Sequence, residues 1–257
     1  MAAAFTTRAM ARYCLGGSGW RDDLQEALAM ARSADPVSYA AVVTYVYFPG
    51  ISLGVLRPGD SAMREIEDAL RIAERSSDDV AVAMARMALG FALVHRPADA
   101  ERDLGQHLLA EVGDVFVRRG ENLDALPIVN MYVARERAGR GDRDEAIPLM
   151  RAAVDLLFRE GRLLIWGVPA TGVLVETLLD RSADGDVAEA EAAIERLAAA
   201  PAEEGLVIRE IWLLRLQALL ARAHGEEAAY RDYRDRYRDM AKTLGFEGHI
   251  DWAEAMP

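Results

Sequence analysis

The chain has 257 residues, a formal net charge of −12 at pH 7 and 52% apolar residues. This apolar fraction excludes a disordered chain, and the length exceeds one ordinary compact core, so two domains or one elongated repeat array are expected. Because an acidic chain repels phosphates and anionic lipid, its charge argues against direct binding of nucleic acid or a membrane surface. The single cysteine, Cys14, excludes a disulfide scaffold and fits a reducing cytoplasm.

The first sixty residues hold two apolar segments that could be taken for targeting or membrane sequences. Arg8 and Arg12 lie within the first apolar segment rather than ahead of it, which is the wrong layout for a secretory signal. Residues 36–56 carry no charge and are numerous enough to cross a bilayer as a helix. Pro49 and Gly50 interrupt this stretch, and tyrosines lie at its middle, so we predict a buried, kinked helix. A cytoplasmic protein without a membrane segment is expected.

Turn signals recur along the whole chain at intervals of 38 to 44 residues. They are Gly19, Gly59, Pro97, Gly141, Gly185 and Gly225. Each follows an apolar helical stretch and precedes a more charged amphipathic one, and these charged stretches are residues 24–34, 62–76, 101–120, 145–161, 188–200 and 228–245. In the fourth stretch Ala146, Met150, Ala153 and Leu157 share one face. No run of alternating apolar residues indicates a strand, so the chain is predicted to be an array of helix pairs.

Acidic residues recur at the starts of the charged stretches. Asp60, Asp142 and Asp186 each come directly after a turn signal. Glu101, Glu145 and Glu189 lie four residues after the turn signal in three successive units. Carboxylates are favoured in the first turn of a helix, so this recurrence indicates helix ends rather than a repeated active site. The cluster of Asp180, Asp184, Asp186 and Glu189 lacks the ligand order of a calcium loop, and solvated acids are expected there.

No catalytic, cofactor or metal motif was found. Residues 167–172 have the glycine spacing of a phosphate loop but lack the lysine that must follow. His107 and Glu111 lie one helical turn apart, yet a zinc site needs three or four ligands. His95 and His224 precede turn signals and are interpreted as donors at helix C-termini. We therefore predict no enzyme activity, no cofactor and no metal for this chain.

The segment 230–242 interleaves arginines with tyrosines, a pattern that can bind RNA by stacking and ion pairing. Acidic residues of the same segment and its flank cancel these positive charges. Tyr230, Tyr233 and Tyr237 also lie on one helical stripe. A packed helix with an ion-paired outer face is favoured over an RNA-binding surface.

The helix pairs resemble tetratricopeptide-like repeats, notably in the segment 131–161, and residues 88–91 (Ala-Leu-Gly-Phe) echo part of the repeat consensus. Residues 240–257 look like the C-terminus of actinobacterial multidomain signalling proteins, in which an adenylyl cyclase or LuxR-type domain precedes an ATPase switch module and a helical repeat region. This resemblance implies that residues 1–257 form one all-α domain, a right-handed αα superhelix of about six long pairs with a short C-terminal capping helix. Neither the cyclase aspartates nor the phosphate loop has a matching position here.

The expected function is that of a non-catalytic interaction or effector-sensing module, whose groove binds a protein or peptide segment or a small effector. Polar and aromatic residues on the first helices of the pairs are the candidate groove residues: Tyr45, Tyr47, Asn130, Arg135, Glu176, Arg209 and Arg215. The alternative is an all-helical enzyme or ligand-binding protein with a pocket near the segment 39–48. Self-association through the exposed ends of the array is a third option.

Overall fold

The computed structural model describes residues 1–76, 78–201 and 205–257, and every regular element in these ranges is helical. The α-helices are α1 (Ala2–Cys14), α2 (Trp20–Arg32), α3 (Pro36–Ser52), α4 (Asp60–Ser76), α5 (Asp79–Leu93), α6 (Asp99–Arg119), α7 (Leu126–Gly139), α8 (Arg143–Arg159), α9 (Val168–Arg181), α10 (Asp186–Ala199), α11 (Val207–Ala223), α12 (Glu227–Leu244) and α13 (Glu247–Glu254). A 3₁₀ turn, η1 (Leu123–Ala125), precedes α7, and a π-helical turn, η2 (Leu163–Gly167), precedes α9. The predicted all-helical class is confirmed for the described residues.

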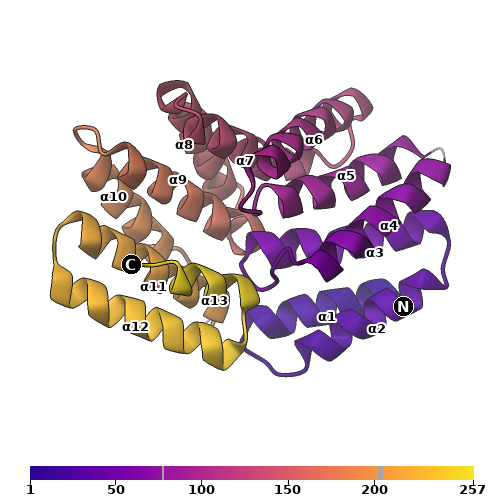
Figure 1. Cartoon of the computed structure of the whole chain (residues 1–257), viewed down its shortest axis with the longest axis horizontal. Coiled ribbons are helices and arrows are strands. Elements are labelled where there is room, and N and C mark those ends of the chain that lie inside the picture. Colours follow the sequence, from indigo (N-terminus) through magenta and orange to yellow (C-terminus); the bar gives the residue numbers. More distant parts are fainter. Residues whose placement is uncertain (77, 202–204) are drawn as a thin grey trace.

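Helices α1 to α12 pack as six consecutive pairs, from α1 with α2 to α11 with α12 (Figure 1). Each of the six turn signals lies between the two helices of one pair. The first helices also pack on one another, α1 on α3, α3 on α5, α7 on α9 and α9 on α11, and so form an inner layer. The second helices bury only one stripe; in α4 it consists of Ala62, Met63, Ile66, Ala69 and Ala73.

The uncharged stretch near the N-terminus forms α3, which is buried from Val46 to Ser52. The helix passes through Pro49 and ends at Ser52, so the expected break at Pro49 and Gly50 is wrong. The chain instead reverses at Gly54, whose φ is +74°, and the amides of Val55 and Leu56 both donate to the Gly50 carbonyl at 2.9 Å. Glycine adopts this left-handed conformation without steric cost, so the reversal falls there.

One helical stretch among the described residues, Leu163–Arg181, is long and apolar enough to cross a membrane, with a mean hydropathy of 1.5. This stretch joins η2 to α9, and 61% of it is buried against the rest of the chain. Core helices of the inner layer have the same composition, so this helix is weak evidence for a membrane segment.

Ion pairs join successive helix pairs at nearly constant sequence separation. Arg96 contacts Asp60, Arg140 contacts Asp103 and Arg181 contacts Asp144, over 36, 37 and 37 residues. The Nη2 of Arg181 also donates a hydrogen bond to the Asp186 carboxylate at 2.7 Å, and the Ala183 amide donates to the same carboxylate at 2.9 Å. Asp186 is buried, so the expectation of solvated acid is wrong at this position. The Arg181 hydrogen bond lowers the pKa of Asp186.

The C-terminal helix α13 packs against the turn that follows α3, so the last part of the chain meets the first (Figure 1). The amides of Glu247 and His249 donate to the carbonyls of Val55 and Gly54 at 3.0 and 2.9 Å. First-turn amides of a helix lack partners within that helix, and here they bind carbonyls beyond the end of another helix. We call this contact between α13 and residues 53–57 the closure.

The closure depends on two glycines that bring two backbones together. A Cβ added to Gly54 would lie 2.5 Å from the Trp252 ring, and one added to Gly248 would lie 2.9 Å from the Gly54 carbonyl oxygen. The Trp212 indole of α11 donates to the Leu53 carbonyl at 3.2 Å. Nearby, Trp20 of α2 packs edge-on against the Phe246 ring at 6.1 Å.

Candidate functional site

A pocket of about 430 Å³ opens between the inner helices and the closure. Its walls come from the turn after α5 and from α6, α7, α8, α9, α11 and α13. We call it the central pocket and define it by Arg102, Arg135, Glu136, Glu176, Arg215 and Trp252. Its volume is typical of small-molecule sites.

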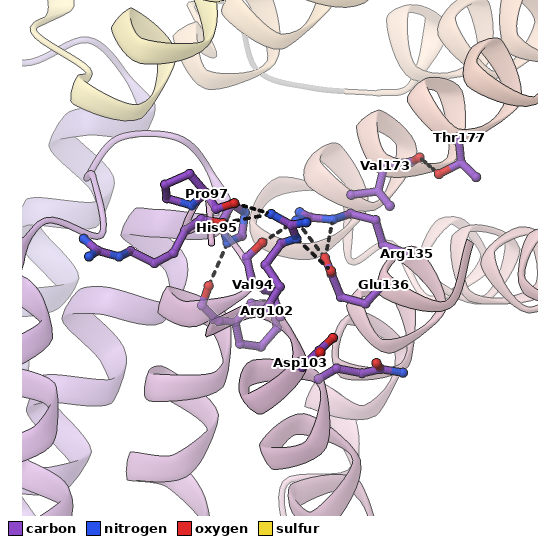
Figure 2. Close-up of polar contacts among 12 residues, drawn as sticks. Val94, His95, Pro97, Arg102, Asp103, Arg135, Glu136, Val173 and Thr177 are labelled. Carbon is purple, nitrogen blue, oxygen red and sulfur yellow. Dashed lines mark hydrogen bonds and ion pairs between the residues drawn. The ribbon is translucent and has the colours of Figure 1, made fainter. Parts of the chain in front are cut away.

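Glu136 of α7 is the carboxylate at which two arginines meet (Figure 2). Its side chain is only 8% exposed. The Nε of Arg135 donates to Glu136 at 3.1 Å, and the Nε of Arg102 lies 3.5 Å from the other carboxylate oxygen. The turn after α5 adds carbonyl acceptors: Val94 for Arg135, and Pro97 for Arg102 at 2.7 Å. These carbonyls lie beyond the last turn of α5, where they have no helical partner.

Arg215 of α11 is largely buried, with a side chain 14% exposed. Its guanidinium lies 4.9 Å from the Trp252 ring centroid and 5.6 Å from that of Trp212, and it pairs with Glu176 of α9. The Nε atom has no hydrogen-bond partner among the described residues. Burial lowers the pKa of Arg215, and the positive charge of Arg135 lowers it further. An arginine remains charged under these conditions.

Two histidines flank the central pocket, and both are neutral. The Nδ1 of His95 is 2.7 Å from the Phe91 carbonyl, which can only accept, so Nδ1 carries the proton and donates to the last turn of α5. Its predicted role as a donor at a helix C-terminus is confirmed. Burial, followed by the charge of Arg135, lowers the pKa of His95 to about 3. His249, within the closure, is fully buried; its Nδ1 contacts the Tyr237 hydroxyl at 2.9 Å, and burial and the Arg215 charge lower its pKa.

The pocket lining is positively charged although the chain is acidic. It contains the arginines Arg96, Arg102, Arg135, Arg143 and Arg215 against the acids Glu136, Glu176 and Asp180. The formal excess is two positive charges, in a chain whose net charge is −12. Arg96 and Arg102 also pair with acids outside the lining, namely Asp60, Glu101 and Asp99. Among the described residues, Arg143 and the buried Nε of Arg215 are the positively charged groups of the lining without a partner.

Three of the seven residues expected in the groove lie together in the central pocket: Arg135, Glu176 and Arg215. The other four lie elsewhere. Tyr45 is 56% exposed near the N-terminus; Tyr47 is buried and donates to Glu65 at 2.8 Å. Asn130 is exposed on α7, and Arg209 donates to the Ala200 carbonyl at 2.7 Å.

Four further residues of the central pocket were not predicted from the sequence as site residues: Arg102, Glu136, Trp212 and Trp252. Glu136 follows Arg135 in a charged stretch that reads as surface, although it is buried. Trp252 belongs to the C-terminal segment on which the family resemblance rested. Tryptophan is rare in this chain, with four in total, so its presence in that segment was the one feature of the sequence that could have indicated a site residue.

A second concavity of about 720 Å³ lies between α1, α2 and α3. We call it the N-terminal groove; its lining is mostly apolar and includes Met1, Met10, Met30, Val42 and Tyr45. It overlaps the segment 39–48 that the alternative prediction named. Its lining residues include no charged side chain.

Within the described ranges no group of three or more histidine, cysteine, aspartate or glutamate residues is placed to hold a metal ion. Cys14 is buried, and burial raises the pKa of its thiol to about 12. The sequence-based expectation for the tyrosine-rich segment agrees with α12: Tyr230 and Tyr237 are buried, while Arg236 pairs with Asp232 at 3.2 Å on the outer face.

No protein-family model matches the chain, and no curated protein matches it. The functional argument therefore starts from the central pocket and the closure.

Proposed function

We propose that this chain is a non-catalytic effector-sensing module of a cytoplasmic regulatory protein. In this proposal a small effector occupies the central pocket, and its binding is passed to a partner domain through the closure. The helix pairs are consistent with a right-handed, tetratricopeptide-like superhelix, and the C-terminal segment supports an origin in actinobacterial multidomain signalling proteins.

The observation that carries the proposal is the double role of α13. Trp252 of α13 lines the central pocket, and the first turn of the same short helix binds the carbonyls of Gly54 and Val55. A ligand in contact with Trp252 therefore meets a different surface when α13 is docked and when it is released. Such a difference in affinity is what a ligand needs to shift a conformational equilibrium.

The state of the polar groups supports sensing over catalysis. Glu136 and Glu176 are held in ion pairs with arginines, and the Thr177 hydroxyl donates to the Val173 carbonyl at 2.8 Å (Figure 2). A general base needs a carboxylate or imidazole free to take a proton from a substrate. Glu136, Glu176 and Thr177 are already bound in these contacts and suit recognition better than proton transfer. Asp180 is the one carboxylate of the lining without such a partner in the described structure.

The test uses the small-molecule fraction of a bacterial extract. The purified protein is mixed with this fraction and passed over a gel-filtration column, and the retained compounds are identified by mass spectrometry. We expect the wild type and the Tyr45→Ala variant to retain the same compound and the Arg215→Met variant to lose it. Hydrogen exchange of the α13 amides should slow when the compound is bound. Retention of nothing, or unchanged α13 exchange, would refute the proposal.

The N-terminal groove gives a second candidate, binding of an apolar ligand. Its supporting observation is the exposed Tyr45 ring above an apolar lining. The same experiment separates the two sites. A compound lost by Tyr45→Ala and kept by Arg215→Met would assign ligand binding to the N-terminal groove.

A further inference from the structure

The ion pairs of the central pocket leave positive charge without a partner. Arg135 pairs with Glu136 alone, whereas Arg102 pairs with both Asp99 and Glu136. Neither Arg143 nor Asp180 makes an ion pair or a side-chain hydrogen bond within the described part of the chain. Arg96 forms ion pairs with Asp60 and Glu101, which lie outside the pocket lining. A buried donor without a partner is costly, and the Nε of Arg215 is such a donor, so an anionic acceptor is the species that this part of the lining lacks.

The geometry of the arginines suits a planar anionic group. A guanidinium presents several N–H donors in a fixed fork that matches a carboxylate or a phosphate. The Nε of Arg215 faces no acceptor, although the atom is buried. Arg135 is close enough to Arg215 for its charge to lower the pKa of that residue. A negative group near both would relieve this repulsion.

Aromatic surface adjoins the same charges. Trp252 is partly exposed, and its ring packs edge-on against Trp212 at 5.4 Å; Tyr132 lines the pocket beneath Arg135 at 5.1 Å. Flat apolar groups pack well against such rings. The site therefore combines charge recognition with a surface for a planar apolar body.

We propose that the central pocket binds a small organic anion, with its carboxylate or phosphate against Arg135 and Arg215 and its planar apolar part against Trp252. This assignment rests on the proposed sensing function and adds the chemical class of the effector. An organic cation would meet the positive charges of Arg135 and Arg215, and the volume of about 430 Å³ fits a free small molecule.

Isothermal titration of the full chain tests the class with defined probes. Benzoate and phenyl phosphate carry both features; benzamide lacks the charge, benzylamine reverses it, and inorganic phosphate lacks the ring. We expect both aromatic anions to bind at least tenfold more tightly than the other three probes. Arg215→Met should weaken their binding at least tenfold, Arg215→Lys should restore part of it, and Arg222→Met, an exposed arginine of the same helix, should leave it unchanged.

Each of the other outcomes would refute one part of the proposal. Equal binding of benzamide or benzylamine refutes the anionic class, and equal binding of inorganic phosphate refutes the aromatic contribution. Tighter binding of a peptide ending in phenylalanine than of benzoate would replace the small molecule by a protein C-terminus. If none of the probes binds, the class is refuted, while the extract experiment still decides the sensing function. Circular dichroism checks that each variant is folded.

Discussion

The central pocket and the N-terminal groove differ in both composition and construction. The pocket is lined by charged and aromatic residues from elements spread between α5 and α13, whereas the groove is apolar and formed by three consecutive helices. The groove follows from local packing, because its walls are neighbours in the chain. The pocket exists only where the inner helices meet the closure, so changes at the closure should affect it and spare the groove.

The largest expected effect is that of Gly54→Ala. The added Cβ would lie 2.5 Å from the Trp252 ring and 2.9 Å from His249, at a backbone φ of +74°. We expect a loss of about 3 kcal/mol in the free energy of unfolding, measured by urea denaturation. Gly225→Ala is the matched control because Gly225 has the same φ with open space around it. It should cost about 1 kcal/mol, and an equal loss in both variants would contradict the steric role of the closure.

The second prediction concerns acid pH and the region of His95. The pKa of His95 is about 3 in the folded chain, against 6.5 for an ordinary histidine. Between these values the unfolded chain binds a proton that the folded chain does not. The contribution of neutral His95 to the free energy of unfolding is thus fully present above pH 6.5 and is lost as the pH falls toward 3. At pH 5 the loss is about 2 kcal/mol, and the lowered pKa of His249 acts in the same direction.

Urea denaturation at pH 7 and pH 5 measures this loss, and hydrogen exchange locates it. Amides of α5, α7 and α13 should lose protection before those of α1 and α2. His95→Gln should reduce the pH dependence, whereas His107→Gln, which removes an exposed histidine, should leave it unchanged. Equal pH dependence in the two variants would show that His95 is not the titrating group.

Arg215→Met should change stability by less than about 1 kcal/mol, in spite of its burial. Removing a buried charge recovers the cost of its desolvation, and methionine keeps most of the apolar contact with Trp252. Glu176 is left unpaired, yet its side chain is 34% exposed and can be solvated. Thermal unfolding measures the change. A loss above 3 kcal/mol would mean that Arg215 supports the fold, and the ligand-binding result for this variant would then lose its meaning.

The smallest effect is expected for Tyr45→Ala in the N-terminal groove. Its side chain is exposed and makes no side-chain hydrogen bond in the described structure. Stability should stay within about 0.5 kcal/mol of the wild type, as for most surface substitutions. Benzoate affinity should also be unchanged. A measurable loss of benzoate binding would show that the groove and the central pocket are coupled.

The helix pairs could be predicted from the sequence because their signals are local. Gly141 between an apolar and a charged helix marks a turn, and the stripe of Ala146, Met150, Ala153 and Leu157 marks the buried face of α8. Arg135, Glu176 and Arg215 were selected as polar residues on inner helices, a criterion that also selected Asn130 and Arg209, which lie outside the central pocket. Pairing of Asp186 with Arg181 was missed because acid clusters in turns are usually solvated.

The closure could not be predicted, for a physical reason. Gly54 and Trp252 carry no signal of each other in the sequence, since their contact depends on how all the intervening helix pairs are arranged in space. Glu136 became a pocket residue for the same reason: its burial depends on Arg102 from the preceding pair. Periodic patterns specify neighbours, and they do not specify which distant units meet.

The distance along the chain between the two sides of the closure also orders the folding of this protein. Arg57 and Glu247, which are hydrogen-bonded at 3.4 Å, are 190 residues apart, whereas each hairpin joins adjacent segments. Contacts between distant residues form late, because the entropy of a large loop must be lost first. During synthesis the earlier hairpins can assemble as they emerge, before α13 is available to dock on residues 53–57. The central pocket, whose lining includes Trp252, is therefore completed after most of the helical structure of the described residues is in place.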